Sequence, residues 1–382
     1  MKKPNKYLIF ALSLAIVNLI VIFLIFGIFK NTESRSLIET AHWISGMEYD
    51  PIAMCGGAAL RPLAPALSLP FEALGEGTGL VIQSIIFYLL CVYFVFKITE
   101  LIYKDGKQAL FASILYAFAI PALKYSLAFH TTNVGSWFFC IFSIYLTLLY
   151  FKKQNEKLII FNGLISGIGV LMKESGGLGI LFFAAMILLS KEFGFKEKVL
   201  KIIKFASIFL IPIIFWEVLV SILAPSFQVT SHSKLLSHTI TYEIKGGPTE
   251  SFRVLLYGLS LLTTFGLLGW LLVFWGALKE WKNKNKERIK ILLALIPFSF
   301  IFLVWPCPDP RHVFIVGTLG ALLGSYGLIN LKKIFKNKTI GLVLVIIIIS
   351  LYVIFNYYSY YINDSLPFID FEDLLHFLKV PN

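Results

Sequence analysis

The chain has 382 residues, of which 58% are hydrophobic and only 15% are charged. Soluble domains have about 45–50% apolar and about 25% charged residues, so this composition excludes an ordinary soluble protein and indicates a polytopic membrane protein. The net charge of +12 does not indicate nucleic-acid binding, because the basic residues gather in short segments between apolar stretches.

The apolar stretches predict an all-α fold with about eleven membrane-spanning helices. The first, residues 7–29, is longer than the apolar core of a cleaved signal peptide, so we expect it to be retained as a helix. Stretches near 20 residues match the thickness of a bilayer. The other expected spans are 79–96, 109–128, 132–151, 158–172, 176–190, 205–222, 255–278, 291–305, 313–330 and 340–358.

The basic residues predict how the chain is oriented. Of the 34 lysines and arginines, 24 fall on one side of these spans, in segments 2–6, 97–107, 152–157, 191–204, 279–290 and 332–338. The positive-inside rule makes that side the cytoplasm. We therefore expect a single multi-pass domain over 1–382 in the plasma membrane, among its lipids, with a cytoplasmic N-terminus, a final span in 331–358 and an outer tail at 359–382.

The first outer loop, residues 30–78, is long and contains four carboxylates at Glu33, Glu39, Glu48 and Asp50. A carboxylate near a cationic phosphate site can act as a general base on a hydroxyl or hold a divalent metal ion. The alternative is that these are solvated loop acids. Further along the same loop, Arg61 opens RPLAPALSLPF, which we interpret as a short interfacial helix rather than a span.

An adjacent cation and anion, Lys173 and Glu174, interrupt the apolar sequence GVLMKESGGLGI at the outer turn between the fifth and sixth spans. The glycines that follow allow a tight turn and a close approach of helices. A lysine at this position suits a lipid phosphate, and Glu174 either pairs with it or positions another cation. The alternative is a pair of side chains that only marks the end of a helix.

A late outer turn, PCPDPRHV, places Arg311 and His312 directly before an apolar span. Three prolines stiffen this turn, and arginine offers a planar set of donors that suits phosphate. The alternative is an arginine that anchors the helix end.

Taken in order, these features resemble the GT-C superfamily of integral-membrane glycosyltransferases. The nearest relatives would be the dolichyl-phosphate-mannose–protein mannosyltransferases and the lipid A aminoarabinose transferase. The resemblance rests on an R-P-L-x-P stretch in the acidic first loop, on L-x-K-E-x-x-G at the turn with Lys173, and on P-x-P-R-[YH] before a late span. The resemblance covers roughly residues 5–330 and implies a GT-C-like core over 1–330, followed by the last span at 331–358 and the tail at 359–382.

The resemblance implies a hexosyltransferase that uses a polyprenyl-phosphate sugar, such as dolichyl-phosphate mannose, and a lipid, glycan or protein acceptor. Arg61, Lys173 and Arg311 match the family's positions for holding the carrier phosphate. The family's acidic pair after the first span is Thr32-Glu33 here, so either Glu33 or Asp50 is the expected base. A second departure is Asn133 in HTTNVGSW, where relatives often have aspartate.

Two other functions remain open at the level of sequence. A transporter or flippase for a lipid-linked substrate would place polar residues within its spans, where Glu217 is the main candidate. An inactive assembly protein that keeps the GT-C fold would account for the departures at Thr32 and Asn133.

Overall fold

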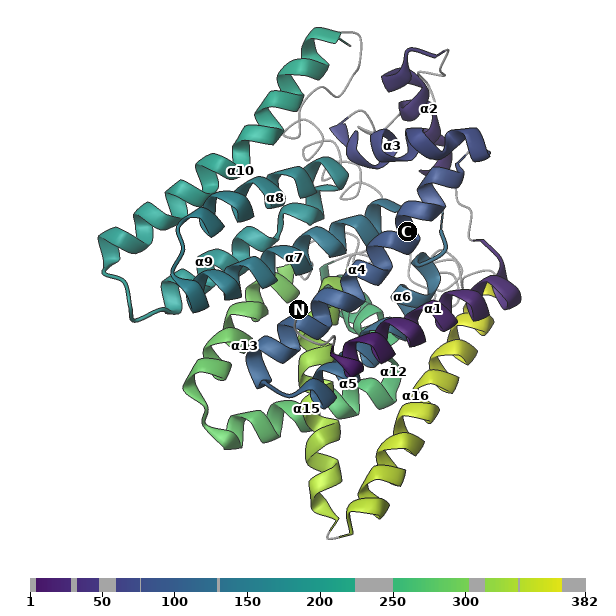
Figure 1. Ribbon diagram of the computed structural model, residues 1–382, viewed down its shortest axis with the longest axis vertical. Helices are drawn as coiled ribbons and strands as arrows, with labels where there is room; N and C mark the ends of the chain where they lie inside the picture. The colour runs from purple at the N-terminus through teal and green to yellow at the C-terminus, as the bar shows by residue number, and fades with distance from the viewer. Residues whose placement is uncertain are drawn as a thin grey trace.

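The computed structural model describes residues 5–28, 33–47, 60–75, 77–128, 131–223, 250–301, 313–335 and 337–365. Within these ranges the structure is a bundle of helices without β-strands, which confirms the all-α membrane fold (Figure 1). Seven of the described helices are long and apolar enough to cross a membrane: α1 (Lys6–Phe26), α4 (Thr78–Tyr103), α7 (Thr131–Lys153), α10 (Phe195–Leu223), α12 (Glu250–Asn283), α15 (Gly317–Ile334) and α16 (Lys338–Ser365).

Shorter helices account for the difference from the expected eleven spans. Several of the expected spans form helices of fewer than 18 residues, so the count of eleven is not confirmed. The shorter α-helices are α2 (Glu33–Ser45), α3 (Leu63–Ser68), α5 (Gly106–Ala117), α6 (Ile120–Tyr125), α8 (Lys157–Met172), α9 (Gly179–Leu189) and α13 (Lys286–Ser299). Three 3-10 helices complete the described elements: η2 (Leu69–Leu74), η3 (Glu174–Gly177) and η5 (Phe314–Val316).

The expected span 109–128 divides into two helices. α5 ends at Ala117, and α6 begins at Ile120 with Pro121 in its first turn. Proline has no N–H to donate and is favoured in the first turn of a helix, which is where Pro121 lies in α6.

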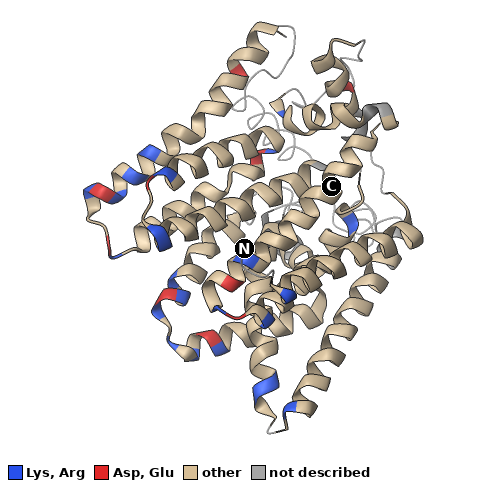
Figure 2. Cartoon of the chain, viewed as in Figure 1, with Lys and Arg blue, Asp and Glu red and all other residues tan. Residues whose placement is uncertain are grey.

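Short turns gather at one end of the bundle, which we call the lysine-rich end. Four helices that begin there have side-chain N-caps. Backbone N–H groups in the first turns of α1, α5, α13 and α16 donate to the side-chain oxygens of Asn5, Asp105, Asn285 and Asn337, respectively. Asn5 also donates to Glu100 Oε1 at 2.7 Å, which joins the start of α1 to the last turn of α4. Most of the lysines and arginines drawn in Figure 2 lie toward the left and lower parts of the view, and a few lie near its centre beside the N-terminus.

Central and peripheral helices differ in burial. In α15, 83% of the most apolar stretch is buried, whereas in α10 the share is 6%. α10 and α16 lie on opposite flanks in Figure 1. Large apolar side chains such as Phe215 of α10, which is 68% exposed, therefore form the surface that faces lipid.

The end opposite the lysine-rich end is covered by α2 and α3 from the first loop. The stretch RPLAPALSLPF forms α3 and η2, as predicted. Gln83 Nε2 of α4 donates to the carbonyl oxygen of Ala64 in α3 at 2.8 Å. Gly79 also makes room for α3, because a Cβ atom there would lie 2.7 Å from Ser68 Cα. These contacts hold the beginning of α3, and with it Arg61, against the bundle.

Candidate functional site

The candidate site is built on the turn between α8 and α9. α8 ends at Met172, Lys173 is extended (φ −167°, ψ 148°), and η3 begins at Glu174. The turn packs closely on α8, since a Cβ atom on Gly169 would lie 2.6 Å from the carbonyl oxygen of Gly176. The predicted tight approach of glycines is therefore confirmed, and it leaves the turn little freedom to move.

The extended backbone at Lys173 sends the two adjacent charged side chains to different partners. Lys173 Nζ donates a hydrogen bond of 2.6 Å to Asn133 Oδ1 in the first turn of α7. Both side chains are buried, with 7% of Lys173 and 1% of Asn133 exposed. A lysine ammonium is thus held inside the protein by a neutral amide.

Glu174 contacts the cation that begins α3. Arg61 Nε donates to Glu174 Oε1 and Arg61 Nη2 donates to Glu174 Oε2, both at 2.9 Å. This is the two-pronged geometry that makes guanidinium–carboxylate pairs strong. Of the two alternatives for Glu174, the structure shows the second: the carboxylate positions another cation, 113 residues away in the sequence.

Packing from α7 supports the turn beneath the charged groups. The Cys140 thiol lies 2.9 Å from the carbonyl oxygen of Ser175, to which it donates. Gly135 allows Met172 to approach α7, because a Cβ atom there would lie 2.8 Å from Met172 Cγ. Contacts with α7 therefore hold in place the turn that contains Lys173 and that binds the Arg61 guanidinium through Glu174.

Several predicted site residues lie outside the described part of the structure. Glu33 begins α2, but its side chain is not among those described, and the remaining residues fall wholly outside: Glu48, Asp50, Arg311 and His312. The structure brings together Arg61, Lys173 and Glu174. The roles of all eight residues remain predictions.

Two polar residues at this end of the bundle were not among the predicted site residues. Asn133 appeared in the sequence only as a departure from a pattern, and its contact with Lys173 could not be read from it. Lys124 is buried in α6, with 7% of its side chain exposed. A lysine within the apolar run of an expected span is a signal that could have marked it.

Metal binding is not supported by the described residues. Among them, no group of three or more His, Cys, Asp and Glu side chains could hold a metal ion. The first-loop carboxylates that were expected to do so lie outside that search, apart from Glu39.

Comparison with known proteins finds a family model that matches part of the chain. Residues 67–220 match the family model for dolichyl-phosphate-mannose-protein mannosyltransferase. The match supports a membrane glycosyltransferase of the GT-C superfamily. It includes Asn133, Lys173 and Glu174, whereas Arg61 precedes it. No curated protein matches the chain.

The family match therefore supports the resemblance drawn from sequence motifs at the level of the superfamily. The matched segment runs from α3 to α10 and contains the whole η3 turn.

Proposed function

We propose that this glycosyltransferase takes its sugar from a polyprenyl-phosphate donor and transfers it to a hydroxyl group of a lipid, glycan or protein acceptor. The observation that carries the proposal is the anchoring of two cations, Arg61 and Lys173, at one turn at the end of the bundle. A lipid-linked phosphate lies near the ends of membrane-spanning helices, where such cations can reach it.

The reaction would take place on the extracytoplasmic side. The lysine-rich end is expected to face the cytoplasm by the positive-inside rule, and the η3 turn lies at the other end of α8. By the same rule, we propose that the N-terminus lies in the cytoplasm.

In the proposed step, the acceptor oxygen attacks the anomeric carbon while the bond from that carbon to the phosphate oxygen breaks. The bonding electrons leave with the phosphate, and the acceptor proton passes to a first-loop carboxylate, for which Glu33, Glu48 and Asp50 are the candidates. Arg61 and Lys173 stabilise the negative charge that develops on the phosphate, which is the most effective place for fixed positive charge. Arg311 and His312 are proposed to join them.

The donor class can be tested with purified protein in vesicles that contain a polyprenyl-phosphate sugar. We expect Lys173→Ala to abolish transfer, while the matched variant Lys204→Ala, at the lysine-rich end, keeps it. Transfer from a nucleotide sugar in place of the lipid donor, or full activity of folded Lys173→Ala, would refute the proposal.

The base can be identified in the same assay with Glu33→Gln, Glu48→Gln and Asp50→Asn. We expect one of the three variants to lose transfer and to keep binding of the polyprenyl phosphate. If all three retain wild-type rates, the base does not come from this loop.

Sidedness can be tested by labelling single cysteines in a background that lacks the native ones. We expect a cysteine at Met47, after α2, to react with an impermeant reagent in intact cells. A cysteine at Gln154, in the turn between α7 and α8, should react only after permeabilisation. The reverse pattern would place the site in the cytoplasm.

A further inference from the structure

We propose that Asn133 is the positioning residue for the Lys173 ammonium, and that its amide also donates a hydrogen bond to the donor phosphate. This inference rests on the proposed function, since it assigns a role at the same phosphate site. It concerns a residue that the family match and the sequence motifs leave without a role.

Asn133 is suited to fix the position of a flexible side chain. The ammonium of a lysine sits on a stem of four carbons and could occupy many positions. Asn133 Oδ1 accepts from Lys173 Nζ at 2.6 Å. Asn133 itself lies in the first turn of α7, is 1% exposed, and its carbonyl oxygen accepts from Ser136 Oγ at 2.8 Å. The contact therefore selects one position for the charge.

The other atom of the same amide is unused. Asn133 Nδ2 is buried and has no hydrogen-bond partner in the described structure. Buried donors are nearly always paired, so an unpaired one calls for an explanation. Nδ2 shares its carbon with the oxygen that contacts Lys173, so a phosphate oxygen arriving at the ammonium comes within reach of this N–H group.

A neutral amide has a further advantage over a carboxylate at this position. The Arg61 guanidinium is paired with the charged Glu174 carboxylate, which reduces the net positive charge at the turn. An aspartate at position 133, which relatives often have, would also hold the ammonium, but in this chain it would add a second negative charge beside Glu174 and remove the N–H donor. Both effects oppose the binding of an anion.

A buried asparagine elsewhere in the same helix pair provides a matched comparison. Asn162 of α8 is also 1% exposed, and its Nδ2 donates to Thr147 Oγ1 at 2.9 Å and to the carbonyl oxygen of Ser143 at 3.2 Å. It joins α8 to α7, and its described contacts include no ammonium. If Asn133 had only a structural role, replacing it with alanine should affect ligand binding in the same way as replacing Asn162.

The test measures binding of polyprenyl phosphate and of uncharged polyprenol of equal length to the full chain in nanodiscs of a neutral lipid. The ratio of the two affinities reports recognition of the phosphate, whereas a general loss of structure weakens both ligands. We expect Asn133→Asp, which keeps the size of the side chain, to lower the ratio about tenfold. Asn133→Ala should lower it less, and Asn162→Ala should leave it unchanged.

The outcomes separate this inference from the proposed function. If Lys173→Ala removes the preference for phosphate while Asn133→Asp and Asn133→Ala both keep it, the role of Asn133 is overturned and the function stands. If Lys173→Ala also keeps the preference, the phosphate site itself is wrong. An equal fall for Asn162→Ala and Asn133→Ala would show a structural role only.

Discussion

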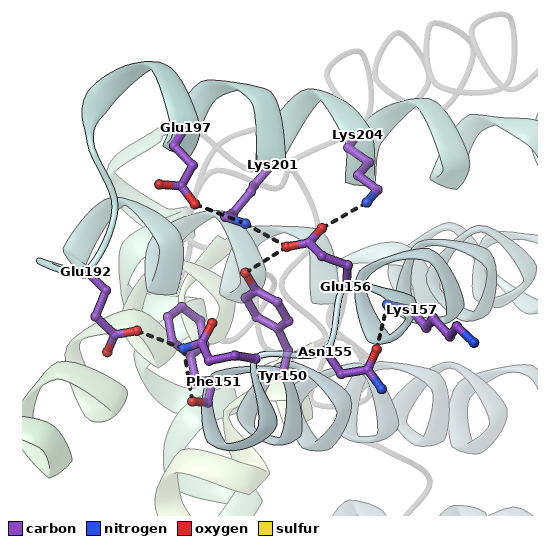
Figure 3. A network of polar contacts seen from close by, with 10 residues as sticks. Tyr150, Phe151, Asn155, Glu156, Lys157, Glu192, Glu197, Lys201 and Lys204 are labelled. Atoms are coloured by element: carbon purple, nitrogen blue, oxygen red, sulfur yellow. Dashed lines mark hydrogen bonds and ion pairs between the residues drawn. The ribbon is translucent and has the colours of Figure 1, made fainter.

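Helix α8 has charged groups at both ends, and the two ends hold their charges in different ways. At the lysine-rich end, Glu156 accepts hydrogen bonds from Lys201 at 2.7 Å and from Lys204 at 2.8 Å, as Figure 3 shows. The Glu156 side chain is 49% exposed. At the other end, the buried Lys173 ammonium donates to the side-chain amide of Asn133. Beside it, Arg61 donates two hydrogen bonds to the Glu174 carboxylate.

The difference bears on our proposal that the end with Lys173 binds the donor phosphate. The Glu156 carboxylate is 49% exposed although Lys201 is only 12% exposed, so water and salt screen these ion pairs and they link α10 to the turn before α8 with little gain in stability. Buried cations are costly and are retained where they have a use. This agrees with our proposal that the η3 turn is the functional end, and substitutions at the two ends should then differ in their effect on sugar transfer.

After the loss of transfer expected for Lys173→Ala, the largest effect should come from Arg61→Ala. This substitution removes one cation and leaves the Glu174 carboxylate without that partner at the proposed phosphate site. We expect sugar transfer in vesicles to fall about 100-fold, comparable to the loss of one donor from an oxyanion hole. The double variant Arg61→Ala/Glu174→Ala should recover part of the rate, because the negative charge is also gone.

At the opposite end, the matched pair Lys201→Ala and Lys201→Ala/Glu156→Ala should leave the transfer rate near that of the wild type. Equal losses of activity at the two ends would remove the distinction between them.

A smaller effect is expected from Gly176→Ala, which tests whether the functional turn is rigid. The new methyl group would overlap the backbone of Gly169, so we expect a loss of about 1–3 kcal/mol in the free energy of unfolding. The control is Gly194→Ala in the turn before α10, where a Cβ atom meets nothing within 4 Å. Denaturant titration should show little change for the control, and equal destabilisation would mean that the η3 turn can relax.

The smallest effect is expected from Glu156→Gln, below about 1 kcal/mol, since the pair is exposed. Partial burial favours the neutral carboxyl, but the hydrogen bonds from Lys201 and Lys204 outweigh it and lower the pKa of Glu156. Because the folded-state pKa lies below the value of about 4.3 for an unfolded chain, this contribution is complete above that pH. It disappears as the pH falls through the folded-state pKa.

The pH dependence can be checked by comparing unfolding of the wild type and Glu156→Gln at pH 7 and at pH 3. The difference between them should be present at pH 7, smaller at pH 3, and reduced by added salt. A difference that grows as the pH falls would contradict the sign of the pKa shift.

Much of the fold followed from the apolar runs and the lysines between them. Each run predicts a helix because a membrane leaves backbone groups no other partner, and the lysines predict which turns gather at one end. The count of long spans was not confirmed. The expected span 109–128 divides into α5 and α6 near Pro121, and α8 and α9 lie close to their expected bounds but have fewer than 18 residues each.

The candidate site could be predicted only in part. Arg61, Lys173 and Glu174 stood out as charges beside apolar stretches, but their pairing depends on the extended backbone of Lys173, which points neighbouring side chains apart. No local sequence pattern predicts the extended conformation of Lys173. Nor does any predict the contact between Arg61 and Glu174, which are 113 residues apart in the sequence. The contact of Lys173 with Asn133 depends on how α7 packs on the turn, and a single sequence does not predict that packing either.

The lengths of α8 and α9 set the depth of the turn they form. Their 16 and 11 residues extend over about 24 Å and about 17 Å, both less than the roughly 30 Å of hydrocarbon in a bilayer. A phosphate bound by Lys173 would therefore sit deeper than the headgroups of the surrounding phospholipids. Such a recess favours a carrier whose single long chain can follow its phosphate inward over a two-tailed lipid held at the surface.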